Sequence, residues 1–208
     1  MEWRADWYED VTDCEKIKEC LEELRCILGE LPLLFTFRTA EEGGEAALDT
    51  ESYMELNHTA ISSGCVDLVD VELFTGDNYV LRMISTARQY GVKVIASNHD
   101  FEKTPGRETI ISRLCKMQEL GADILKIAVM PQSKEDVMRL LLATDEMASE
   151  YAQQPIVTMS MGELGVLSRL CGEQFGSAIT FGSAGKASAP GQIEAAELKK
   201  VLEILHRK

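Results

Sequence analysis

The sequence predicts an α/β fold built around a parallel β-sheet. Short apolar segments alternate with longer amphipathic segments along the 208 residues, as they do in βαβ units. Several of the short segments are apolar nearly throughout, which is typical of parallel strands buried on both faces. Because no linker, charge block or low-complexity tract interrupts this alternation, we predict a single domain over residues 1–208.

Seven strands and seven helices are expected. The strands are predicted at residues 2–6, 31–39, 66–74, 92–100, 122–130, 154–161 and 177–182. The helices are predicted at residues 12–29, 49–64, 77–91, 105–121, 133–152, 163–172 and 192–208, with Asp49 or Thr50 as the N-cap of the second. A (β/α)8 barrel has eight strands and about 250 residues. The chain is therefore either an open doubly wound sheet or a barrel that lacks its first βα unit.

The composition narrows the class of protein. A net charge of −14 disfavours nucleic acid and anionic membranes as partners. No apolar run approaches the length of about 20 residues that spans a bilayer, and the first residues do not resemble a signal peptide. The six cysteines have no zinc-ligand spacing, so we expect reduced thiols in a cytoplasmic protein and no metal site.

Every predicted strand carries polar side chains at or near its C-terminal end. They are Glu2, Arg4, Arg38, Glu72, His99, Lys126, Ser160 and Thr180. In a parallel barrel these strand ends meet at one mouth, where the active site lies. Any one of these residues alone is equally well explained as a solvated strand end. The whole set predicts an active site at that mouth.

Two of these residues suggest a particular chemistry. Lys126 stands in the middle of the apolar segment ADILKIAVMP, at residues 122–131. Burial and neighbouring cations would favour its neutral amine, which can attack a carbonyl group; alternatively, the ammonium group reaches the surface while its stem stays buried. His99 ends the preceding strand and is either a general acid/base or a histidine bonded to the backbone.

The small-residue segment 180–193 is long for a βα connection. It suggests either a mobile lid or a backbone cradle for an anion.

These residues lie in seven motifs that resemble those of type I 3-dehydroquinate dehydratase, in order and over essentially the whole chain. The motifs are EWRAD (2–6), FTFRTAEEGGE (35–45), DLVDVELFTG (67–76), SNHDFEKTP (97–105), ADILKIAVMP (122–131), TMSMGELGVLSRL (158–170) and FGSAITFGSAGKASAPGQI (175–193). The resemblance implies a (β/α)8 TIM barrel of the class I aldolase type, and EWRAD matches its second strand. The first strand and helix of the family pattern are missing here.

The resemblance also implies the reaction and the roles of individual residues. The expected reaction is dehydration of 3-dehydroquinate to 3-dehydroshikimate by a homodimer, without a cofactor. Lys126 matches the lysine that forms the Schiff base, His99 the general acid/base, and Glu42 the carboxylate that orients this histidine. The residues that match contacts to the substrate are Glu2, Arg4 and Arg38 at the ring hydroxyls, and Arg169, Ser188 and Gln192 at the carboxylate.

Arg4, Arg38, Lys126 and Arg169 are expected to give an anionic substrate a favourable site in an acidic protein. Two other functions are open at this point. One alternative is another Schiff-base lyase of the aldolase type. The other is an inactive fragment that only assembles with other chains or binds a ligand.

Overall fold

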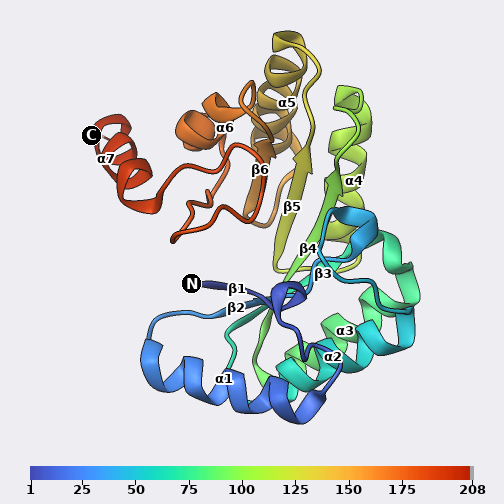
Figure 1. Cartoon of the computed structure of the whole chain (residues 1–208). Helices are drawn as coiled ribbons and strands as arrows, with labels where there is room; N and C mark the ends of the chain where they lie inside the picture. The colour runs from blue at the N-terminus through green and yellow to red at the C-terminus, as the bar shows by residue number, and fades with distance from the viewer. Residues whose placement is uncertain (207–208) are drawn as a thin grey trace. The chain divides into compact units, whose positions relative to one another are not determined.

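Parallel strands alternate with helices along residues 1–206, the part of the chain that the computed structural model describes (Figure 1). The chain divides into two compact units. Unit 1 comprises residues Met1–Asn98 together with Glu119–Ile124, and unit 2 comprises His99–Gln118 together with the residues from Leu125 onward. The single domain predicted over residues 1–208 stays a prediction.

Unit 1 is built on a four-stranded parallel sheet in chain order. Its strands are β1 (Glu2–Arg4), β2 (Leu34–Thr36), β3 (Leu68–Glu72) and β4 (Lys93–Asp100), of which the last two residues belong to unit 2. Its helices are α1 (Cys14–Leu28), α2 (Thr50–Ser62) and α3 (Asp77–Tyr90). Helix α2 packs against both α1 and α3 (Figure 1).

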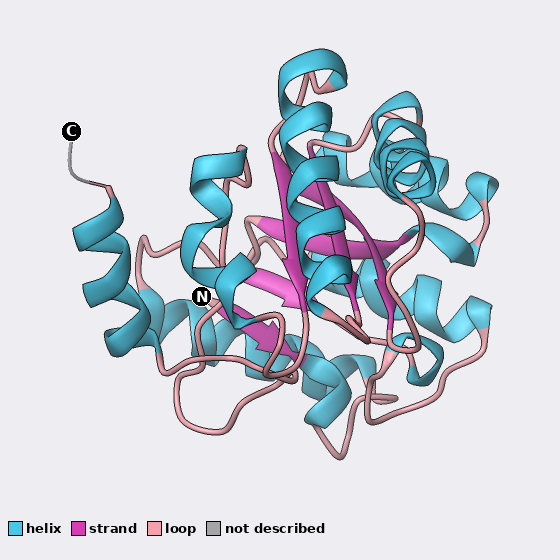
Figure 2. Cartoon of the chain, turned by 90° about the horizontal axis from the view of Figure 1, so that it is seen from above, coloured by secondary structure: helices cyan, strands magenta, loops and turns pink. Residues whose placement is uncertain are grey.

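Unit 2 contains the parallel pair β5 (Ile124–Val129) and β6 (Ile156–Ser160). Its helices are α4 (Arg107–Glu119), α5 (Lys134–Glu146), α6 (Val166–Cys171) and α7 (Ala195–Leu205). Both α5 and α6 pack against β6. Figure 2, in which helices are cyan and strands magenta, shows helices lying alongside the strands.

Local sequence explains where these helices begin and end. Asp13 caps α1 by accepting hydrogen bonds from the backbone N–H groups of Glu15 and Lys16. Asp49 caps α2 in the same way, which confirms one of the two predicted cap residues. Helix α3 ends at Gly91, whose φ of 73° lies in the left-handed region that glycine adopts most readily.

Strand register gives the neighbours of three polar residues that were predicted in or at the ends of strands. Arg4 pairs with Thr36 at the end of β1 and β2, and Glu72 pairs with Ser97 in β3 and β4. In unit 2, Lys126 pairs with Val157 in the interior of β5 and β6. The core beneath these residues is apolar in each unit, with Phe35, Val69 and Ile127 fully buried.

The strand predicted at residues 177–182 is wrong. This segment forms only an isolated bridge from Ser177 to Ile156 and then leaves β6. The Ala178 N–H donates to the Ile156 carbonyl at 2.7 Å, but the Thr180 hydroxyl donates to the Arg169 carbonyl on α6. The segment therefore bonds to α6 and does not form a continuous ladder with β6. The structure has six strands in residues 1–206, not seven.

Other expectations differ from the structure mainly at element ends. The helix predicted at 133–152 continues beyond α5 as a π-helix at Met147–Tyr151, and the end of the helix predicted at 192–208 lies outside the described residues. His58 and His206 are exposed, and the cysteines are free thiols, as expected. No helix within residues 1–206 combines the length and the hydrophobicity needed to cross a bilayer.

A buried pair of hydroxyl groups joins α5 to β6 and gives a test of packing in unit 2. The Thr144 hydroxyl donates to the Leu140 carbonyl at 2.8 Å and lies 2.7 Å from the Thr158 hydroxyl, which must therefore be the donor to Thr144. Thr144→Val leaves a buried donor on Thr158 unsatisfied, whereas Thr158→Val removes that donor.

We therefore expect Thr144→Val to lower the free energy of unfolding by about 2 kcal/mol and Thr158→Val by only about 1 kcal/mol. The double variant should lose less than the sum of the two single losses. Urea unfolding measures all three values. Equal losses in the single variants would contradict the assigned direction of the hydrogen bond.

Candidate functional site

Arg38 is the centre of a buried ionic cluster in unit 1. It lies two residues beyond β2, and its guanidinium donates from Nη1 to Glu72 at 2.7 Å and from Nη2 to Asp70 at 2.8 Å. Nη1 also donates to the Ser97 hydroxyl at 3.1 Å, and this hydroxyl donates in turn to Asp70. Although burial opposes its charge, the carboxylates of Asp70, Glu72 and Glu42 raise the pKa of Arg38 above its usual value.

Glu42 lies at the edge of the same cluster. It ends the 3-10 turn η2 (Ala40–Glu42), accepts a hydrogen bond of 3.1 Å from the Asn98 amide, and lies 3.7 Å from Arg38 Nη1. Burial, followed by the negative charge of Glu72, holds the pKa of Glu42 well above the usual carboxyl range.

Glu2 and Arg4 lie beside this cluster, in β1, and are half-buried. The Thr36 hydroxyl donates to Glu2 at 2.9 Å, and Arg4 makes a two-pronged ion pair with the buried Asp6, from Nε and Nη2, at 2.7 Å each. Unit 1 thus holds four of the predicted site residues, namely Glu2, Arg4, Arg38 and Glu42.

Unit 2 holds the two residues predicted to react. Lys126 lies in the middle of β5 with only 4% of its surface exposed, so its ammonium or amine group does not extend into bulk water. Its Nζ lies 4.8 Å from the centroid of the Phe181 ring. His99, in the last two residues of β4, belongs to the same unit and is half-buried.

Arg169, on α6, is the most unusual charged residue of unit 2. Its side chain is buried, with 2% of the residue exposed. Nη2 donates to the Pro190 carbonyl at 3.0 Å, Nη1 lies 3.6 Å from the sulfur of Met159, and Nε has no partner among residues 1–206. Desolvation by burial lowers the pKa of Arg169 to about 10. A buried guanidinium with a free donor and no carboxylate partner is suited to binding an anion.

The loop at residues 182–192 meets this arginine at Pro190. The Pro190 carbonyl also accepts the Gly162 N–H at 3.2 Å. On either side of Pro190, Gln192 accepts the backbone N–H of Ser188 at 2.8 Å and donates to its hydroxyl at 3.1 Å. Ser188 and Gln192 therefore bond to each other within this loop, and Arg169 on α6 bonds to the same loop at Pro190.

Sequence reasoning missed Asp70 and Phe181 as members of these clusters. Asp70 and Glu72 stand two residues apart in the apolar segment VDLVDVELF (66–74), so both point to the same face of β3. That pattern is the same signal that marked Lys126. Phe181 had no comparable signal, because the segment that carries it was taken for a regular strand.

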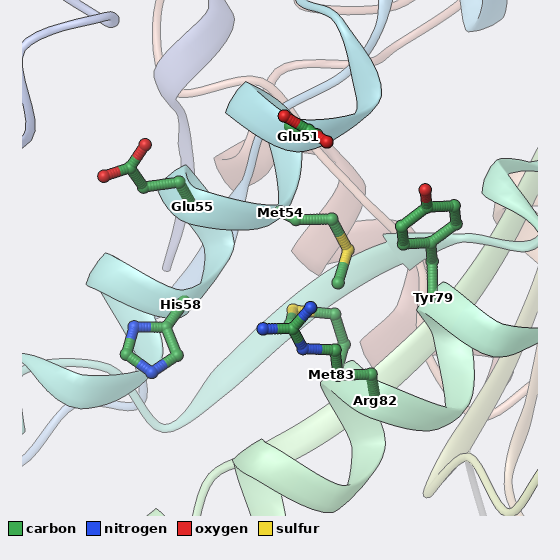
Figure 3. Close-up of a pocket in the computed structure, with 7 residues that line it drawn as sticks. All are labelled: Glu51, Met54, Glu55, His58, Tyr79, Arg82 and Met83. Atoms are coloured by element: carbon green, nitrogen blue, oxygen red, sulfur yellow. The ribbon is translucent and has the colours of Figure 1, made fainter.

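A groove lies between α2 and α3 in unit 1, away from the Arg38 cluster (Figure 3). This groove of about 470 Å³ has Met54 and Met83 at its base and Glu51, Glu55, His58, Tyr79 and Arg82 around it. It contains none of the predicted site residues. Within residues 1–206, no group of His, Cys, Asp or Glu side chains is arranged to hold a metal ion.

Comparisons with known proteins give a consistent family. The family model described as type I 3-dehydroquinase matches residues 1–208. The 3-dehydroquinate dehydratase of Listeria welshimeri is 58% identical over 207 residues, which are 100% of this chain and 82% of that protein.

Solved structures give the same result. The crystal structure of type I 3-dehydroquinate dehydratase from Clostridium difficile, with covalently modified comenic acid, is 56% identical, with a TM-score of 0.96 over 99% of this chain and 81% of that one. The enzyme from Enterococcus faecalis is 45% identical, with a TM-score of 0.92 over 99% and 82%. These matches confirm the predicted TIM-barrel type of fold over the doubly wound alternative.

The contrast between the two buried arginines predicts opposite effects of the same substitution. Arg169→Met removes a desolvated charge without a carboxylate partner, so the free energy of unfolding should stay equal or rise by up to about 2 kcal/mol. Arg38→Met leaves Asp70 and Glu72 buried without their partner and should cost about 3–5 kcal/mol. Urea unfolding in ligand-free dilute buffer checks both, and a clear loss of stability in Arg169→Met would contradict the assignment of Arg169 as an unpaired charge.

Proposed function

The chain belongs to the type I 3-dehydroquinase family, and from this premise we propose that it dehydrates 3-dehydroquinate to 3-dehydroshikimate through a Schiff base on Lys126. Family membership makes the chain a carbon–oxygen hydro-lyase that acts in the shikimate pathway. The proposal also includes the Schiff base on Lys126, the general acid/base role of His99 and the contacts to the substrate. The main observation that supports it is the burial of Lys126 in the interior of β5.

The surroundings of Lys126 support a nucleophilic amine. The Lys126 side chain is buried in β5 with its Nζ beside the Phe181 ring, so the nitrogen is held in one place inside the unit, as a nucleophile that forms a covalent intermediate requires. A stem that snorkels to the surface, the alternative that the sequence left open, would leave the head of the side chain exposed. The low exposure of Lys126 favours the functional interpretation.

The proposed reaction needs only a lysine, a general acid/base and water. The neutral Lys126 amine attacks the C3 ketone of the substrate, and loss of water gives the imine. The imine withdraws electrons and acidifies the C2–H bond, so His99 can take the C2 proton. The C1 hydroxyl then leaves as water with a proton from His99. Hydrolysis of the imine consumes one water and returns Lys126, so the net change is loss of one water molecule.

The carboxylate of the substrate fits the chemistry of Arg169. Its guanidinium is buried, keeps a free donor and has no carboxylate partner among residues 1–206, so a bound carboxylate would supply the missing negative charge. Ser188 and Gln192 lie in the loop that Arg169 contacts through Pro190, which supports their proposed place at the same carboxylate. The proposed ring-hydroxyl contacts of Glu2, Arg4 and Arg38 rest on the motif resemblance.

The homodimer and the orientation of His99 by Glu42 rest on that resemblance alone, and the cytoplasmic location rests on the cysteines and the first residues of the sequence. All three stay predictions.

Reductive trapping tests the Schiff base directly. Borohydride added together with 3-dehydroquinate should reduce the imine and attach the substrate skeleton to Lys126, as peptide mass spectrometry can establish. Lys126→Met should give no adduct and no turnover. Lys134→Met, which changes an exposed lysine at the start of α5, should behave as the unmodified protein.

The same measurement separates the alternative functions. Turnover of 3-dehydroquinate without an adduct on Lys126 would rule out the proposed mechanism. An adduct and turnover with a sugar phosphate but not with 3-dehydroquinate would favour another Schiff-base lyase of the aldolase type. Absence of both turnover and calorimetric binding of 3-dehydroquinate would favour an inactive fragment.

His99→Ala tests the general acid/base. Because general acid/base catalysis typically contributes 10²- to 10⁴-fold, we expect kcat for 3-dehydroquinate to fall by about that factor. His58→Ala is the matched control, since His58 is exposed on α2 and belongs to the groove that lacks predicted site residues. Similar kcat values for His99→Ala and His58→Ala would remove His99 from the mechanism.

A further inference from the structure

The Glu72 carboxylate binds three groups of the segment that follows β2. Oε1 accepts from Arg38 Nη1 at 2.7 Å and from the Thr39 backbone N–H at 2.9 Å, and Oε2 accepts from the Thr39 hydroxyl at 2.7 Å. Glu72 itself is buried and ends β3, and its backbone N–H donates to the phenol oxygen of Tyr53 at 3.1 Å. The carboxylate is thus a fixed reference point for both the side chain of Arg38 and the backbone of Thr39.

Thr39 connects the Glu72 carboxylate to Glu42 through hydrogen bonds. Thr39 is the N-cap of η2, and its side-chain oxygen accepts the Glu42 N–H at 3.3 Å while its hydroxyl proton goes to Glu72. The Thr39 carbonyl also accepts the N–H groups of Glu42 at 3.1 Å and Gly44 at 2.8 Å. No side chain can be added at Gly44, because a Cβ there would lie 1.8 Å from the Arg38 carbonyl oxygen. The backbone of this turn is closely packed at Gly44, and Glu72 holds Thr39, the residue that caps the turn.

Charge gives Glu72 a second influence on Glu42. In unit 1 the guanidinium of Arg38 lies within 4.0 Å of three carboxyl groups, those of Glu42, Asp70 and Glu72. Three buried carboxyl groups that share one cation carry a net negative charge, which favours protonation of one member. Glu42 is the member with the longest distance to Arg38, at 3.7 Å, and burial together with the charge of Glu72 holds its pKa high.

We propose that Glu72 is a positioning residue for the dehydration: it fixes Arg38 and the turn at residues 39–42, and thereby sets the position and protonation of the Glu42 carboxyl group. This inference rests on the proposed function, because it assigns Arg38 and Glu42 to that reaction. Glu72 itself need not touch the substrate, since the three hydrogen bonds that its carboxylate accepts all come from Arg38 and Thr39.

Two substitutions at Glu72 separate its charge from its reach. Glu72→Gln keeps the length of the side chain but loses the charge and cannot accept both Thr39 groups and Arg38 with the same geometry. Glu72→Asp keeps the charge but withdraws the carboxylate from Thr39. Because small misplacements of catalytic groups are costly, we expect kcat for 3-dehydroquinate to fall about 10- to 100-fold in both, with KM changed by less than about threefold.

The pH dependence distinguishes positioning from a general loss of structure. The groups that face Glu42 in unit 1 are Arg38, Asp70, Glu72 and the neutral amide of Asn98. Removing the negative charge of Glu72 lowers the pKa of Glu42, so the limb of the kcat profile that reports Glu42 should move to lower pH in Glu72→Gln. It should stay in place in Glu72→Asp. An unmoved limb in Glu72→Gln would overturn the electrostatic part of the proposal.

Asp67→Asn is the matched control for the loss of a structural clamp. Asp67 lies just before β3 and also binds an arginine and a backbone N–H, namely Arg25 at 2.6 Å and Leu33 at 2.7 Å. The Asp67→Asn variant should have a lower melting temperature than the unmodified protein and the same kcat. If Glu72→Gln fails to fold, Thr39→Val removes the hydroxyl link alone and should lower kcat, while Thr39→Ser should restore it.

The unmodified protein is assayed first, so that two failures can be told apart. If it does not dehydrate 3-dehydroquinate, the proposed function fails. If it does, and Glu72→Gln or Thr39→Val keeps the kcat of Asp67→Asn, the positioning role of Glu72 is wrong.

Discussion

The free-energy cost of burying charged side chains constrains the structure around Arg38, at the C-terminal ends of β2 and β3. Arg38, Asp70 and Glu72 are almost wholly removed from water, and each ion in such a place costs several kcal/mol unless it is paired. In unit 1 this cost is offset by short hydrogen bonds within the Arg38 cluster. The geometry of Thr39, η2 and Glu42 follows from the need to satisfy those charges.

Much of the fold could be predicted because the alternation of apolar and amphipathic segments is strong and local. The order of strands and helices and the cap at Asp49 depend on neighbouring residues, and the structure contains them. Lys126 could be singled out for the same reason, since a charge inside an apolar strand is visible in the sequence alone. The position of Arg169 relative to Pro190 depends on a long-range contact, and only the motif resemblance suggested it.

The errors arose where non-local bonds decide the structure. Residues 177–182 have the composition of a strand, yet beyond the bond from Ala178 to Ile156 the segment leaves β6, and the Thr180 hydroxyl bonds to α6. Likewise, nothing local shows that Asp70 and Glu72 share one guanidinium that belongs to the end of another strand. Which charged side chains pair across two strands depends on the register of those strands. The register of β2 and β3 is known only from the folded chain.

The two buried arginines differ in how their charge is compensated. The sequence suggested that Arg4, Arg38, Lys126 and Arg169 would together make the site favourable for an anion. In unit 1, Arg4 is paired with Asp6, and Arg38 faces more carboxyl groups than it can neutralise. Of these three arginines, Arg169 alone has no carboxylate partner within residues 1–206. The proposed binding of a substrate carboxylate therefore rests on Arg169, whereas the Arg38 cluster is suited to holding donors and acceptors in fixed positions.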